Sequence, residues 1–187
     1  MMNKSFSWRI VFAFIALLFS AAVYAGDPNP DAAPPAQCGG VDILLILDSS
    51  GSISSSEAAE VVDAVNGMLD DLMGTGSRVA IIEFSSSANT LLGSYTEITI
   101  SNRNTLIDPI LNNYITSTGG STNWEDAFVE ASSLMGTIGA AHYVVFSTDG
   151  NPNADNGPGD SLDRAETAAN AVKALSTPRR PHILGLG

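Results

Sequence analysis

A short apolar segment, Val41 to Leu47, constrains the fold more than any other part of this chain. Six of its seven residues are Val, Ile or Leu, and the exception is Asp42. The segment is too short for a helix and too continuous for a strand with one solvated face, so it predicts a strand buried on both faces. Strands of this kind lie centrally in parallel sheets, which places the chain in the α/β class.

The apolar segment ends abruptly in a polar turn, Asp48-Ser49-Ser50-Gly51-Ser52. In open α/β sheets, ligands bind where the strands end. A carboxylate and two hydroxyls stand at alternate positions, and Gly51 permits a turn tight enough to bring them round one point. Hard oxygen ligands suit Mg²⁺, or Mn²⁺ and Ca²⁺, better than zinc. Taken alone, the turn is equally consistent with an Asp that binds backbone amides, and both interpretations stay open here.

Two later segments carry a resemblance to a known family. The strand and its turn resemble the opening of a von Willebrand factor type A domain, which has a metal-ion-dependent adhesion site. That family has a threonine in a second loop and an aspartate, usually followed by Gly, in a third. Gly119-Gly120-Ser121-Thr122-Asn123 is similar to the second loop, and Ser147-Thr148-Asp149-Gly150 to the third. The metal-site residues that the resemblance implies are Asp48, Ser50, Ser52, Thr122 and Asp149.

The remaining sequence predicts alternating helices and strands. Apolar residues recur at helical spacing in three segments, 54–73, 124–135 and 161–175. In the last of these we expect an inward face of Leu162, Ala165, Ala168, Ala169, Val172 and Leu175. Apolar or β-prone runs predict strands at 78–84, 90–99, 142–146 and 181–186.

The segment from Asn102 to Tyr114 predicts at best a weak helix, because Pro109 is tolerable only near a helix start. The segment from Asn151 to Asp160 is rich in Asn, Asp, Gly and Pro, and we interpret it as a solvated loop beside the site. The order of elements predicts a doubly wound, mostly parallel sheet flanked by helices. The von Willebrand resemblance implies this Rossmann-like fold across residues 41–187.

The first 25 residues have the features of a secretory signal peptide. Lys4 and Arg9 precede an apolar run, and Val23-Tyr24-Ala25 is a small-residue cleavage site before Gly26. The apolar run is shorter than the roughly twenty residues of a membrane span. We therefore expect secretion to an extracellular or periplasmic location, and attachment at the cell surface stays open. We expect no membrane insertion after the signal peptide is cleaved. Residues 26–40 form a Pro/Ala-rich linker, and residues 41–187 form the domain.

The charge of the chain excludes some classes of partner. The net charge is −12, and removing the signal peptide takes away two basic residues and no acidic one, which makes it −14. Nucleic acid is therefore not an expected partner. A cation or a basic protein surface would be favoured.

Cys38 is the only cysteine of the chain. In a secreted protein an unpaired thiol calls for a partner, although an inert free cysteine stays open. The family continues past the strand matched by Ile183 to Gly185 with a further strand and a closing helix, so we expect the sequence to be truncated at Gly187. In several secreted members a cysteine before the first strand bridges one after the last helix, which implies a partner for Cys38 beyond Gly187.

Three functional hypotheses follow. By resemblance, the domain is a non-enzymatic adhesion module in which hydroxyls bind the ion directly, the two aspartates hold its waters, and an open position takes an Asp or Glu of a protein partner. The alternative is a Mg²⁺-dependent, phosphatase-like hydrolase with Asp48 as nucleophile. Such enzymes carry a second Asp where this chain has Ser50, and a Lys near the site, whereas Lys173 lies in mid-helix. The third hypothesis is a metal-free assembly module.

Overall fold

The computed structural model describes residues 39–114, 118–175 and 180–186. The predicted signal peptide, most of the linker and Cys38 lie outside these residues. The strands are β1 (Asp42–Asp48), β2 (Arg78–Phe84), β3 (Ala88–Glu97), β4 (Tyr143–Ser147) and β5 (His182–Leu186). The helices are α2 (Ser55–Leu72), α3 (Ile100–Asn102), α4 (Asp108–Tyr114), α5 (Trp124–Ile138) and α6 (Ser161–Ala174), with a π-helical turn η1 (Arg103–Ile107) between α3 and α4.

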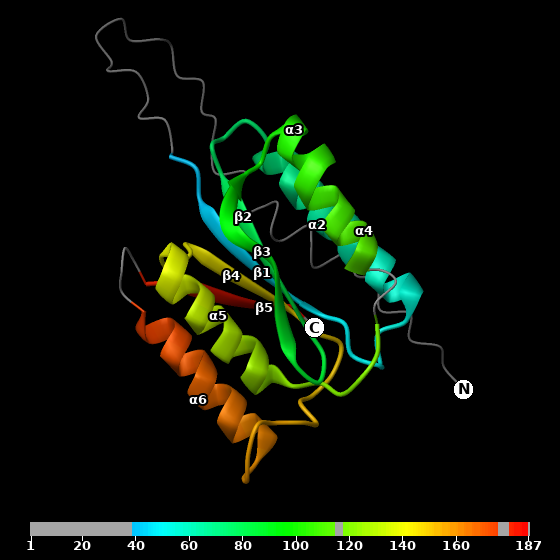
Figure 1. The fold of residues 1–187 in the computed structure, drawn as a ribbon, viewed down its shortest axis with the longest axis vertical. Helices are drawn as coiled ribbons and strands as arrows, with labels where there is room; N and C mark the ends of the chain where they lie inside the picture. Colours follow the sequence, from blue (N-terminus) through cyan, green and yellow to red (C-terminus); the bar gives the residue numbers. More distant parts are fainter. Residues whose placement is uncertain (1–38, 115–117, 176–179, 187) are drawn as a thin grey trace, which may run out of the picture. The chain divides into compact units, whose positions relative to one another are not determined.

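The five strands form one sheet in the order β3-β2-β1-β4-β5 (Figure 1). β1 pairs in parallel with β2 and β4, β4 pairs in parallel with β5, and only β3 runs antiparallel, against β2. Every residue of β1 is buried. The prediction of a central, doubly covered strand in a mostly parallel, doubly wound sheet is therefore confirmed.

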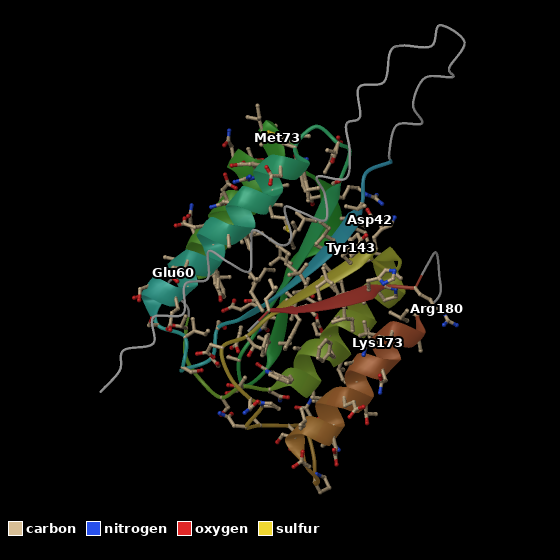
Figure 2. All side chains as sticks on the ribbon, turned by 180° about the vertical axis from the view of Figure 1, so that it is seen from behind. Asp42, Glu60, Met73, Tyr143, Lys173 and Arg180 are labelled. Carbon is tan, nitrogen blue, oxygen red and sulfur yellow. The ribbon has the colours of Figure 1, made fainter. Side chains whose placement is uncertain are left out.

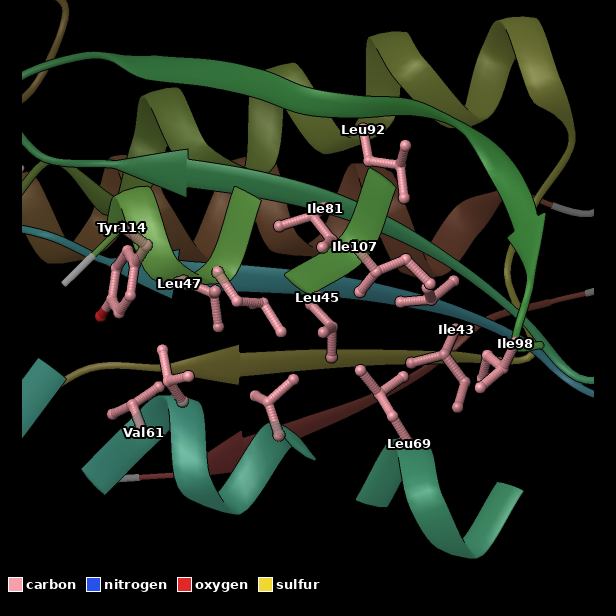
Figure 3. Close-up of a cluster of buried hydrophobic side chains, with 14 of the residues drawn as sticks. Ile43, Leu45, Leu47, Val61, Leu69, Ile81, Leu92, Ile98, Ile107 and Tyr114 are labelled. Carbon is pink, nitrogen blue, oxygen red and sulfur yellow. The ribbon is translucent and has the colours of Figure 1, made fainter. Parts of the chain in front are cut away.

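The alternating side chains of β1 enter two hydrophobic cores, one on each face of the sheet. α2 and α4 cover one face, and α5 and α6 cover the other (Figure 1). Ile43, Leu45 and Leu47 point toward α2, where they pack with Val61 and Leu69 (Figure 3). The residues of β1 that enter the core under α5 are Leu44 and Ile46. Burial on both faces explains why the strand is an almost unbroken apolar run.

The segment from Ile100 to Tyr114 is more regularly helical than its sequence predicted. It runs through α3, η1 and α4, and the wide turn η1 ends two residues before Pro109. The Asp108 N–H bonds to the carbonyl of Arg103, five residues back. A wider turn of this kind accommodates a proline, which lacks the N–H donor that a regular helix requires.

The prediction for one residue of α6 is wrong. Ala165, Ala168 and Val172 are buried as expected, but the side chain of Leu162 is 54% exposed. Leu162 lies in the first turn of α6, and Figure 1 shows this turn beyond the ends of the strands. No helix in the described part of the chain is long and apolar enough to cross a membrane.

Candidate functional site

Three loops meet at the sheet edge where β1 and β4 end. They are the first loop (49–54, after β1), the second loop (118–123, before α5) and the third loop (148–160, between β4 and α6). The Gly119 N–H donates to the Ser49 carbonyl at 2.6 Å, and the Gly51 N–H donates to the Gly120 carbonyl at 2.9 Å. These two main-chain bonds join the first loop to the second.

Gly120 is required where the second loop passes the loop between β2 and β3. Its φ is +88°, and a Cβ built on it would lie 2.8 Å from Oγ of Ser86. The Ser86 hydroxyl accepts a hydrogen bond from the Ser121 N–H at 2.9 Å. A glycine at this position lets the chain turn and still pass close to the neighbouring loop.

Asp48 is the most constrained of the predicted site residues. Its side chain is buried, Oδ1 accepts a hydrogen bond from the Ser50 N–H at 2.8 Å, and Oδ2 accepts one from the Thr148 hydroxyl at 2.7 Å. Its carbonyl accepts a bond from the Tyr114 hydroxyl at 2.5 Å. Tyr114 and Thr148 were not identified from the sequence, because no local motif indicates these long-range contacts.

Hydrogen bonds of the Ser50 main chain and of the Ser50 and Ser52 hydroxyls connect Asp48 with Asp149. The hydroxyl oxygens of Ser50 and Ser52 are 3.2 Å apart, and the Ser52 hydroxyl donates to Oδ1 of Asp149 at 2.9 Å. The structure therefore brings four of the five predicted residues into one hydrogen-bonded cluster: Asp48, Ser50, Ser52 and Asp149.

Thr122, the fifth predicted residue, lies in the second loop and is only 3% exposed. Its main-chain N–H donates to Oδ1 of Asn153, and its carbonyl accepts from the Asn153 N–H. Thr122 directly precedes the residue that caps α5. The cap is Asn123, whose side-chain oxygen accepts from the Asp126 N–H at 3.1 Å. The Thr122 hydroxyl makes no hydrogen bond with any residue that the structure describes.

The third loop is solvent-exposed in part, but it is also bound to the first turn of α5. The Asn156 N–H donates to Oε2 of Glu125 at 2.8 Å, and its side chain bonds to Asp126 and Asn123. Arg164 forms a two-point ion pair with Glu125, with a shortest N···O distance of 2.6 Å. These hydrogen bonds, led by that from Arg164, lower the pKa of the Glu125 carboxyl.

The carboxylates Asp155 and Asp160 have local structural roles in this loop. Asp155 accepts hydrogen bonds from the Gly157 N–H and the Ser161 hydroxyl, and these bonds lower its pKa. Asp160 caps α6 by accepting from the N–H groups of Leu162 and Asp163. Capping of this type satisfies amides that have no partner within the helix.

The donor set determines which ligands the cluster suits. No group of three or more His, Cys, Asp and Glu side chains in the described ranges is arranged to hold a metal. The clustered groups are instead hydroxyl and carboxylate oxygens, which are ligands that hard divalent cations accept. Because Asp48 already accepts a hydrogen bond on each carboxylate oxygen, it suits binding to an ion through water better than direct ligation.

The two histidines of the chain lie away from this cluster. Nδ1 of His142 accepts from the Asp42 N–H at 2.7 Å, at the end of the sheet where β1 begins. Figure 2 shows Asp42 and Tyr143 close together at that end. His182 stacks at a tilt on the Tyr143 ring, with 5.9 Å between centroids. Both histidines thus belong to the opposite edge of the sheet.

Solved structures share this fold at low sequence identity. A von Willebrand factor type A protein from Catenulispora acidiphila matches with a TM-score of 0.58 and 14% identity, over 80% of this chain and 34% of that one. A mutant PilB minor pilin from Streptococcus sanguinis gives 0.60 and 17%, over 83% and 52% of the two chains. The manganese-loaded TRAP protein of Plasmodium vivax gives 0.53 and 23%, over 79% and 57%.

The chain thus spans between about a third and somewhat over half of the length of these structures. No curated protein matches the chain significantly. The family model of the von Willebrand factor type A domain matches residues 42–177, which include β1, all three loops and α6. The chain therefore belongs to the von Willebrand factor type A domain family.

Proposed function

We propose that this domain is a secreted adhesion module that binds a protein partner through a divalent cation, Mg²⁺ or a similar ion such as Mn²⁺ or Ca²⁺. The proposed metal-site residues are Asp48, Ser50, Ser52, Thr122 and Asp149. The observation that carries the proposal is the convergence of Asp48, Ser50, Ser52 and Asp149 in one hydrogen-bonded cluster beside the loop of Thr122.

Neutral and charged residues of the proposed site would have different roles. The neutral hydroxyls of Ser50, Ser52 and Thr122 would contact the ion, and the carboxylates of Asp48 and Asp149 would hold its coordinated waters. With few charged direct ligands, a bound ion keeps an affinity for an added negative group. The partner would therefore present an Asp or Glu side chain at the open coordination position.

The family and its neighbours support the adhesive and extracellular parts of the proposal. Proteins with a similar fold include a minor pilin and the manganese-loaded TRAP protein. The predicted signal peptide agrees with secretion, and the net charge of −12 opposes binding to nucleic acid.

The hydrolase alternative finds less support in the geometry of Asp48. A nucleophilic carboxylate must reach its substrate, whereas Asp48 is 1% exposed and both its oxygens accept hydrogen bonds from the protein. Release of phosphate from p-nitrophenyl phosphate by the wild type, and not by Asp48→Asn, would replace the adhesion proposal with this alternative.

Mn²⁺ binding tests the proposed site. Isothermal titration of the purified domain should show one Mn²⁺ site, which Asp149→Ala removes while leaving the circular dichroism spectrum unchanged. The control is Asp63→Ala, which removes an exposed carboxylate of α2 and should leave Mn²⁺ affinity unchanged. Equal Mn²⁺ affinity in Asp149→Ala and wild type would contradict the assignment.

A peptide-display selection tests the partner chemistry. Peptides selected on the Mn²⁺-loaded domain should be enriched in Asp or Glu and should be released by EDTA. Replacing that residue with Asn or Gln should abolish binding, because an amide lacks the negative charge. Selection of the same peptides in EDTA, or retention after the amide replacement, would rule out ion-mediated capture of a carboxylate.

A further inference from the structure

We infer that Asn153 is a positioning residue that fixes the main chain of Thr122 and thereby directs the Thr122 hydroxyl toward the proposed metal site. This inference rests on the proposed function, because it assigns a residue that serves that site without contacting the ion.

The contact between the two residues has two points. The Thr122 N–H donates to Oδ1 of Asn153 at 2.8 Å, and the Thr122 carbonyl accepts from the Asn153 N–H at 3.0 Å. The Ala154 N–H lies 3.4 Å from the same carbonyl. Both polar groups of the Thr122 main chain are thus bound to the third loop, and two bonds on opposite sides of Cα restrict its rotation.

The second loop needs a restraint at Thr122, such as these hydrogen bonds to the third loop. Gly120 has a positive φ of +88°, a region that glycine enters at little cost, so the chain before Thr122 is intrinsically permissive. The Thr122 hydroxyl bonds to no described residue, so its direction depends on the main chain. Hydroxyl ligands of a metal ion need fixed directions, which neighbouring hydrogen bonds usually supply.

The third loop is itself anchored close to Asn153. Three residues further on, Asn156 bonds to Asn123, Glu125 and Asp126, at the start of the helix that follows Thr122. The restraint on Thr122 therefore connects two segments that are both fixed to α5. This arrangement differs from the simple solvated loop that the sequence suggested.

The chain offers a matched control for Asn153. Asn151 and Asn153 are both exposed residues of the third loop, but only Asn153 bonds to Thr122. The two substitutions Asn153→Ala and Asn151→Ala thus remove the same exposed group two positions apart. In Asn153→Asp the side-chain acceptor for the Thr122 N–H is kept.

Mn²⁺ titration of these variants tests the link to the site. Asn153→Ala should weaken Mn²⁺ binding by about tenfold, as removal of residues that orient metal ligands typically does. Asn153→Asp should bind Mn²⁺ at least as tightly as wild type does. Asn151→Ala should bind Mn²⁺ with the wild-type affinity. In a Thr122→Ala background, Asn153→Ala should cause no further loss. An equal loss in both backgrounds would show that Asn153 does not act through Thr122.

Amide hydrogen exchange tests the geometry without metal. In the metal-free protein the Thr122 N–H should be protected in wild type, Asn151→Ala and Asn153→Asp, and should exchange at least tenfold faster in Asn153→Ala. Equal protection in Asn153→Ala would overturn the inference. If the wild type binds no Mn²⁺, the proposed function and this role both fail. If the wild type binds and Asn153→Ala binds equally, only the role of Asn153 fails.

Discussion

The hydroxyl of Thr148 lies 2.7 Å from Oδ2 of Asp48, so it joins the ends of two parallel strands at the proposed site. The pairing of Leu47 with Ser147 places Asp48 and Thr148 side by side, one residue further along each strand. The indole N–H of Trp124 donates to the same hydroxyl at 3.3 Å. Thr148 thus connects β1, β4 and α5 through one oxygen and fixes the direction of a buried carboxylate.

Thr148→Val should lower stability and metal affinity together. The substitution keeps the shape of the side chain but leaves Oδ2 of buried Asp48 without its donor, which costs about 1–3 kcal/mol. Urea unfolding in EDTA measures the stability, and Mn²⁺ titration measures the site. Thr137→Val is the control, because among the described residues the Thr137 hydroxyl bonds only to the Ser133 carbonyl, on the exposed side of α5. An unchanged urea midpoint for Thr148→Val would show that the hydrogen bond from Thr148 to Asp48 does not contribute to stability.

A pair of Gly→Ala changes should have opposite effects. Gly120→Ala forces alanine into a φ of +88° and brings its Cβ against Oγ of Ser86, so we expect a loss of at least about 1 kcal/mol. Gly136→Ala lies within α5, where a Cβ meets nothing within 4 Å, and should stabilise by about 0.5–1 kcal/mol.

Thermal unfolding in EDTA measures both variants. Mn²⁺ affinity should fall only in Gly120→Ala, because only that change displaces the loop that carries Thr122. Equal melting temperatures for the two variants would contradict the close approach at Gly120.

The sequence predicted the parts of the fold that depend on repeated local patterns. The apolar run of β1 needed no knowledge of its neighbours, because burial on both faces selects the five consecutive Ile and Leu residues from Ile43 to Leu47. The helical spacing of α2 was equally local, because its buried apolar residues recur every three or four positions. The prediction that Leu162 faces inward was wrong, because helical spacing shows which residues share a face of the helix. It does not show where the sheet below that face ends.

The site was predictable only for residues within motifs. Asp48, Ser50 and Ser52 stand close together in the sequence, whereas Asn153 meets Thr122 across 31 residues and Thr148 meets Asp48 across 100. Such contacts depend on strand register and on the path of an irregular loop, and neither leaves a periodic signal. The residues that we propose position the metal-site residues were therefore missed, whereas the proposed metal-site residues all lie within the three motifs.

Arg103 should contribute to stability more than other basic residues. It is buried in η1 and bonds to Asp70, Asp108 and Asn66, which ties the irregular helix to α2. Asp70 is 65% exposed at its side chain, so solvent weakens that pair. We expect Arg103→Met to cost about 1–3 kcal/mol in urea unfolding. Lys173→Met, at an exposed position of α6, should stay within about 0.5 kcal/mol. Equal urea midpoints for wild type and Arg103→Met would refute this role for Arg103.

Tyr114 should make stability depend on pH in the alkaline range. Burial raises the pKa of its hydroxyl above the ordinary value of about 10, and the nearby charges of Asp48, Glu83 and Asp149 raise it further. Above pH 10 the unfolded chain therefore loses this proton while the folded chain keeps it. The unfolded state binds fewer protons, so the free energy of unfolding falls by up to about 1.4 kcal/mol per pH unit from this group.

Tyr114→Phe separates this effect from other alkaline titrations. At pH 7 the variant should be less stable than wild type by about 1–3 kcal/mol, because the buried Asp48 carbonyl loses its donor. Since phenylalanine does not ionise, the difference between the two proteins should stay constant up to about pH 10 and then narrow. Urea unfolding from pH 7 to 11 measures the difference. Tyrosinate absorbance should show a late step, coupled to unfolding, in wild type only. A difference that stays constant to pH 11 would mean that Tyr114 ionises equally readily in the folded and unfolded chains.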